Sequence, residues 1–171
     1  MGLHVSSTHS LFLEQEALAD LMDADKERGR PDAVVAQNLA RAKEMNGLYQ
    51  SADKDYELAI SLTRNEIAPF WLRSALVKLQ LGDTKGGMNV LKKVQERFSQ
   101  ASEVRAAYAA LLVATGDRAA AKDAYLKIPE SDRLQFADDS YLQSTVSWPP
   151  VAISALESVA TEAGDRKVPS T

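Results

Sequence analysis

The residue types that most often carry catalysis or bind metals are scarce in this sequence. His4 and His9 are the only histidines, and because they are five residues apart they do not share one face of a helix. Cysteine is absent, which excludes disulfides, thiolate metal sites and cysteine nucleophiles. Both histidines precede the segments expected to pack, so no Ser-His-Asp arrangement has a base. We therefore expect no catalytic residue, no metal site and no bound cofactor.

Two other stretches contain residues that could do chemistry. The "GDTKGG" stretch at 82–87 is rich in glycine, but no strand precedes it and it lacks the lysine spacing of a phosphate-binding loop. Acidic residues crowd residues 14–27, but they scatter around a helix and alternate with basic residues, so we interpret them as a solvated face. Neither stretch predicts an enzyme.

The overall charge also limits the choice of partner. The chain of 171 residues has 20 basic and 24 acidic residues, a net charge of -4, which gives no general attraction to nucleic acid or anionic lipid. No stretch reaches the ~20 apolar residues that a membrane-spanning helix needs. We expect a soluble chain, cytoplasmic as written, or periplasmic or organellar if a targeting segment has been removed. The oligomeric state stays open.

Helix-forming residues dominate, and Gly-Asp, Asn-Gly and proline-containing joints interrupt them. This pattern predicts an all-α protein whose short linkers favour antiparallel neighbouring helices. The predicted helices cover residues 9–28, 32–45, 48–63, 68–81, 84–98, 101–115, 118–127, 131–146 and 150–163. The polar tail after them, residues 165–171, is expected to fray.

An internal repeat organises these helices. Gly82 and Gly116 lie 34 residues apart, and Gly47 lies 35 before Gly82. Small residues recur seven before and five after each glycine, and apolar residues, most of them larger, recur nine and twelve after it. In order along the chain these positions hold Ala40, Ala52, Tyr56 and Ala59; Ala75, Gly87, Leu91 and Val94; and Ala109, Ala121, Tyr125 and Ile128. Small residues at such places let two helix axes approach closely, and the glycine permits a left-handed C-cap.

A period of 34 residues with two helices per unit resembles the tetratricopeptide repeat family over residues 31–133. Trp71 stands where that family has its aromatic residue, whereas the usual tyrosine four before the turn is replaced by Lys43, Lys78 and Leu112. The resemblance implies a right-handed solenoid of antiparallel helix pairs, without identifying a subfamily.

That resemblance implies one helical-repeat domain over residues 1–171. Its expected parts are an N-terminal helix at 9–28, three repeats at 31–66, 67–100 and 101–134, a degenerate fourth repeat at 135–164, and the tail. The fourth unit would turn at Pro150, with Ala155 and Val159 at the later positions.

The resemblance also implies a binding surface, because in this family the first helices of successive units line a concave groove. Carried over position by position, the groove residues are Gln37, Asn38, Arg41, Leu72, Arg73, Leu76, Leu79, Ala110 and Tyr141. Three leucines facing water would form an apolar patch of the kind that binds partners, and the alanines would leave room for a helix or extended segment. Arg41 and Arg73 would orient an acidic end of the ligand. The alternative is that the terminal helices fold into this groove and bury it.

The leading hypothesis is therefore a non-catalytic scaffold or adaptor that binds a peptide or helix of another protein. "KIPESDR" at 127–133 resembles unit ends in bacterial proteins of envelope polysaccharide export, and the three-repeat layout resembles type III secretion chaperones. A fragment of a larger solenoid with a structural role is the alternative, and an enzyme is third. Trp148, which precedes two prolines, is interpreted as a plug at the end of the core, with a partner anchor as the alternative.

Overall fold

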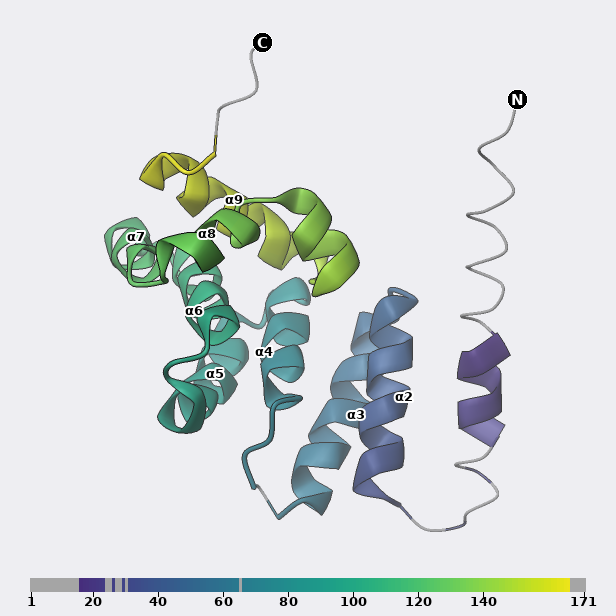
Figure 1. The fold of residues 1–171 in the computed structure, drawn as a ribbon. Coiled ribbons are helices and arrows are strands. Elements are labelled where there is room, and N and C mark those ends of the chain that lie inside the picture. The colour runs from purple at the N-terminus through teal and green to yellow at the C-terminus, as the bar shows by residue number, and fades with distance from the viewer. Residues whose placement is uncertain (1–15, 24–25, 27–28, 30, 65, 167–171) are drawn as a thin grey trace, which may run out of the picture. The chain divides into compact units, whose positions relative to one another are not determined.

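The computed structural model describes residues 16–23, 26, 29, 31–64 and 66–166 and shows a helical protein (Figure 1). No strand occurs among these residues. Of the helix predicted over 9–28, residues 16–23 and 26 are helical, and the others, like His4 and His9, lie outside the described residues. The predicted all-α class is confirmed.

The helices that follow match the predicted ranges to within three residues at each end, with one exception. They are α2 Ala33–Met45, α3 Tyr49–Leu62, α4 Trp71–Gln80, α5 Thr84–Phe98, α6 Ser102–Ala114, α7 Arg118–Leu126, α8 Glu130–Phe136, the short π-helix η1 Tyr141–Thr145, and α9 Pro150–Ala163.

The exception is the segment 131–146, for which the prediction of a single helix is wrong. The chain leaves α8 at Phe136, Ala137 and Asp138 are not helical, and helical structure resumes at Asp139 and continues into η1. At this break the Asp138 carboxylate accepts a hydrogen bond from the Ser140 backbone N–H at 2.8 Å. A short acidic side chain that satisfies a nearby N–H in this way competes with the helix for that donor, so the helix is interrupted here.

Consecutive helices pack in pairs, α2 with α3, α4 with α5 and α6 with α7. Each pair turns at a glycine with positive φ, +72° at Gly47, +81° at Gly82 and +85° at Gly116. In the last two turns the next residue is an aspartate, Asp83 or Asp117, whose carboxylate caps the following helix. The predicted turning points are therefore confirmed. Because each connection is so short, the two helices of a pair run in opposite directions.

The predicted small and large positions around these turns are all buried. Gly87 shows how close the helix axes come, because a Cβ added there would lie 2.9 Å from the backbone carbonyl oxygen of Ala75. A backbone oxygen cannot swing aside as a side chain can. The spacing of small residues therefore encodes the close approach of α4 and α5.

Enlarging a small residue at these positions is expected to overpack the helix pair. Ala75→Leu and Ala109→Leu should each lower the free energy of unfolding by about 1 to 3 kcal/mol, because both alanines have no exposed surface. Ala119→Leu, on an exposed position of α7, is the matched control and should change stability by less than about 0.5 kcal/mol. Urea unfolding followed by circular dichroism measures all three, and equal midpoints would contradict the packing register.

The chain divides into two compact units, residues 1–66 and residues 67–171, called unit 1 and unit 2 below. The division coincides with the predicted boundary between the first and second repeats. Unit 1 contains the α2–α3 pair, and unit 2 contains α4 to α9. In unit 2, α9 packs against α6, α7 and α4, so the C-terminal helix belongs to its core (Figure 1). The prediction of one continuous repeat domain stays a prediction.

Candidate binding site

The predicted groove face of α4 is covered by the chain itself. Arg73 donates hydrogen bonds to the backbone oxygens of Val146 at 2.9 Å and Ser147 at 2.5 Å. Two turns further along the same face, the side-chain oxygen of Gln80 accepts from the backbone N–H of Val151 at 2.9 Å. The segment that leads into α9 therefore lies along this face of α4.

The three leucines of the predicted groove are consequently core residues. Leu72, Leu76 and Leu79 are at most 6% exposed. The expectation that they face water is wrong, because the segment from Val146 to Val151 and the start of α9 lie over that face. Arg73 was also expected to face the groove and to orient an acidic ligand. Its guanidinium instead donates hydrogen bonds to backbone carbonyls of its own chain.

The alanine-lined part of the groove, on α6, holds α9. Ala110 has no exposed surface, and neither do Ala106 and Ala107 beside it. The face that α9 buries in return is small and apolar, with Ala152, Ile153, Leu156, Val159 and Ala160. The room that the alanines leave for an apolar helix is thus taken by a helix of the same chain, which is the alternative considered for this groove.

In unit 1 the predicted groove residues lie on α2. Asn38 is exposed, and Gln37 and Arg41 are half-buried. Arg41 forms an ion pair with the Glu44 carboxylate at 3.1 Å, and that buried carboxylate also accepts a hydrogen bond from the Tyr56 hydroxyl at 2.7 Å. Arg41 therefore supports the packing of α2 on α3.

The last predicted groove residue, Tyr141, belongs to an aromatic cluster in unit 2. Its ring meets Phe136 edge-on, with centroids 5.5 Å apart and an interplanar angle of 84°. Phe136 in turn contacts Trp148 at a centroid distance of 6.2 Å. Trp148 is buried, as expected for a plug at the end of the core. Tyr141 therefore packs beside the turn that leads into α9.

Ion pairs anchor the first residues of the tail, which was expected to fray from residue 165. Asp165 pairs with Arg133 at 2.5 Å, and Arg166 pairs with Asp139 and, at 3.3 Å, with Glu157. The hydrogen bond from Arg166 lowers the pKa of Asp139, whereas burial first, and then the Asp139 carboxylate, raise the pKa of Glu157. The end of α9 is thus fixed to the segment around α8 by charge.

Burial has a similar effect on Tyr125, a residue of the repeat register. Burial raises the pKa of its hydroxyl above the ordinary value, and the nearby Asp165 carboxylate raises it further. That hydroxyl donates to the backbone oxygen of Arg133 at 3.2 Å. It therefore stays protonated and supports the contact between α7 and α8.

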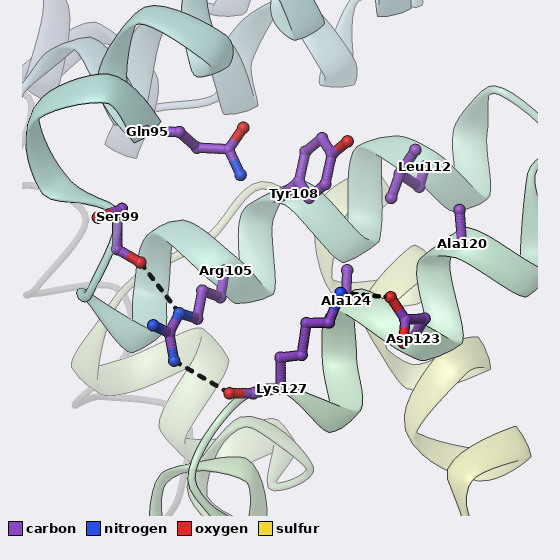
Figure 2. Close-up of a pocket in the computed structure, with 9 residues that line it drawn as sticks. All are labelled: Gln95, Ser99, Arg105, Tyr108, Leu112, Ala120, Asp123, Ala124 and Lys127. Atoms are coloured by element: carbon purple, nitrogen blue, oxygen red, sulfur yellow. Dashed lines mark hydrogen bonds and ion pairs between the residues drawn. The ribbon is translucent and has the colours of Figure 1, made fainter.

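An open cleft on unit 2, formed by α5, α6 and α7, is the feature that sequence reasoning missed (Figure 2). It has a volume of about 560 Å³ and is lined by Gln95, Ser99, Arg105, Tyr108, Leu112, Ala120, Asp123, Ala124 and Lys127. Tyr108 and Leu112, four residues apart, lie on one face of α6, and Ala120 and Ala124 lie on one face of α7. The small alanines leave the space that the tyrosine and leucine border.

Hydrogen bonds from one arginine connect two walls of the cleft. Arg105 donates to the backbone oxygen of Ser99 and to the backbone oxygen of Lys127, both at 3.0 Å, and to the Gln100 side chain at 2.7 Å. Figure 2 shows the guanidinium between the end of α5 and the end of α7. Beyond it, Lys127 forms an exposed ion pair with Asp123 at 2.6 Å. The cleft is therefore preformed at one end, with a charged pair along its α7 wall.

A signal for this cleft was present in the sequence. Tyr108 is a large aromatic residue next to Ala109, yet the repeat register assigns the core position to the alanine. An aromatic side chain that the core register does not use is a candidate surface residue.

Within the described part of the chain, no helix has the length and apolar character to cross a membrane. The same residues contain no group of three or more histidine, cysteine, aspartate or glutamate side chains placed to hold a metal ion.

Comparison with known families and curated proteins gives no match, so the fold and the cleft carry the argument about function. No protein-family model matches the chain, and no curated protein matches it. The resemblance to tetratricopeptide repeats, which rests on the spacing around Gly47, Gly82 and Gly116, stays a prediction.

Proposed function

We propose that the protein is a non-catalytic interaction module that binds a segment of another protein in the α5–α7 cleft. The proposal includes the right-handed, tetratricopeptide-like stacking of the helix pairs, for which the repeat spacing is the support. The observation that carries it is the cleft itself, an open hollow whose lining combines apolar side chains with polar and charged ones. Such a combination is what binding pockets usually present.

The dimensions of the cleft favour a peptide segment as its occupant. From Arg105 to Leu112 its floor follows two turns of α6, a distance of roughly 10 Å. An extended chain advances about 3.3 Å per residue, so roughly three residues would fit along it. One apolar side chain could contact Tyr108 and Leu112, and the amide of Gln95 could pair with the backbone of the segment.

The rigidity of the cleft supports the same proposal. Three hydrogen bonds already hold Arg105, so part of the side-chain ordering that binding would otherwise require is complete in the free protein. The Lys127–Asp123 pair is more than 60% exposed on both sides and contributes little to stability. It can therefore exchange partners when a ligand arrives.

Filling the cleft is expected to abolish partner binding without unfolding the protein. Ala120→Trp places an indole into the space beside Tyr108, whereas Ala119→Trp puts the same ring on the exposed face of the first turn of α7. The full chain and both variants would be used as bait, and the retained proteins compared by mass spectrometry. Partners retained by the native chain and Ala119→Trp should be lost with Ala120→Trp, while all three melt alike. The same set of partners on all three baits would exclude the cleft as the binding site.

A further inference from the structure

The turn that leads into α9 depends on one strained residue. Among the described residues, only Arg64 and Ser147 combine a side chain with a positive φ, and φ of Ser147 is +49°. This left-handed region is unfavourable for any residue with a Cβ atom. After Ser147 the chain is stiff, since Trp148 precedes a proline and Pro149 is extended at φ -63° and ψ 146°. The reversal that brings α9 back onto unit 2 is therefore concentrated at Ser147.

The ion pairs and hydrogen bonds described for α9 join two parts of unit 2. One part is residues 67–145, and the other is the segment from Trp148 to Arg166. Between them, Trp148 donates to the Glu103 carboxylate at 2.9 Å, Glu162 pairs with Arg118 at 2.6 Å and Asp165 pairs with Arg133 at 2.5 Å. None of these contacts requires that both parts belong to the same chain.

We propose that two copies of this chain exchange α9, so that each groove on α4 and α6 is filled by the helix of the other copy. A short connection under strain favours such an exchange, because the contacts of α9 with its groove form again between the two copies while the strained turn is relieved. If Ser147 becomes extended, the stiff Trp148–Pro149 segment carries α9 away from its own groove. The occupant of each groove is thus the α9 helix of a second copy, which has the same sequence as the helix that it replaces.

Concentration decides which form is present. A short tether gives α9 an effective concentration in the millimolar range near its own groove, so the closed monomer dominates in dilute solution. The hydrogen bonds from Arg73 to the carbonyls of Val146 and Ser147 also hold the closed turn. Relief of strain at two copies of Ser147 lowers the concentration at which the exchanged dimer forms.

Charge reversal across the exchanged contact tests this directly. In Arg133→Asp, two acidic groups face each other within one chain, and in Asp165→Arg, two basic groups do so. A mixture of the two variants can restore both pairs only by exchanging α9. We expect the mixture, refolded together, to show twice the monomer mass of 18.6 kDa by light scattering and to melt at a higher temperature than either variant alone.

The matched control is the Lys43–Asp55 pair, which joins α2 to α3 and does not involve α9. Its side chains are 16% and 19% exposed, against 15% and 14% for Arg133 and Asp165. A mixture of Lys43→Asp and Asp55→Lys should therefore stay monomeric. An unchanged mass and melting temperature for the Arg133→Asp and Asp165→Arg mixture, or an equal dimer in the control mixture, would overturn the exchange.

A second variant keeps the test valid if a charge-reversed chain does not fold. Ser147→Gly removes the conformational strain that favours opening, since glycine adopts positive φ readily. In sedimentation equilibrium, the concentration at which half of the chains are dimeric should rise at least tenfold relative to the native chain. A native chain that stays monomeric up to about 1 mM, the effective concentration of a short tether, or a midpoint that Ser147→Gly leaves unchanged, overturns the proposal.

Discussion

Leu76→Glu is expected to unfold unit 2. Leu76 has no exposed surface, and the chain from Val146 to Val151 lies along its face of α4. The substitution removes a buried aliphatic side chain, which alone costs about 2 to 5 kcal/mol, and leaves a carboxylate without a partner in a site closed to water. Because single domains are stable by only about 5 to 15 kcal/mol, the variant should be partly or fully unfolded at room temperature.

Leu81→Glu is the matched control for this substitution. Leu81 lies at the C-terminal end of the same helix and is 38% exposed. A carboxylate there meets only the unfavourable end of the helix dipole, at a cost of about 0.3 to 1 kcal/mol. Thermal melting by circular dichroism should therefore show a large difference between the two variants. If Leu76→Glu melts together with Leu81→Glu, then the face of α4 is open in solution and the groove hypothesis for its leucines is restored.

The helix pairs could be predicted from the sequence because their determinants are local. Close approach of two helices needs small residues at fixed distances from a glycine turn, and Ala75, Gly87 and Ala109 meet that need regardless of the rest of the chain. Helix ends were equally accessible, since Asp83 and Asp117 cap the helices that follow them. The break after Phe136 was missed because the Asp138 carboxylate accepts the hydrogen bond of the Ser140 N–H in a stretch that has no glycine or proline to mark the end of a helix.

The groove could not be assigned in the same way, because its outcome depends on distant segments. The amphipathic pattern of α9 predicts that it buries one face, but it does not specify against which helix. Arg73 illustrates the limit. Its acceptors are the backbone oxygens of Val146 and Ser147, and every residue offers such an acceptor, so no sequence pattern identifies them. The cleft beside Tyr108 was not predicted for a related reason, since it arises from the relative positions of three helices.

Trp148→Ala is expected to produce the second large effect. Trp148 is buried, its ring lies 6.2 Å from that of Phe136, and its indole N–H donates to Glu103 at 2.9 Å. Truncation of a buried tryptophan to alanine costs about 3 to 5 kcal/mol through lost contacts and the cavity that remains. The backbone of Trp148 also donates to Leu142 at 2.8 Å, so the loss should loosen η1 as well as the start of α9.

Trp148→Phe separates packing from hydrogen bonding at this position. Phenylalanine keeps most of the apolar ring but leaves the Glu103 carboxylate without its donor, so the expected cost is smaller, about 1 to 3 kcal/mol. Urea unfolding of the native chain and both variants measures the series, and the order of stability should be native, Trp148→Phe, Trp148→Ala. An alanine variant as stable as the native chain would show that Trp148 does not support the core. Its role as an anchor for a partner would then be the better interpretation, because a tryptophan that does not stabilise the fold would need another function.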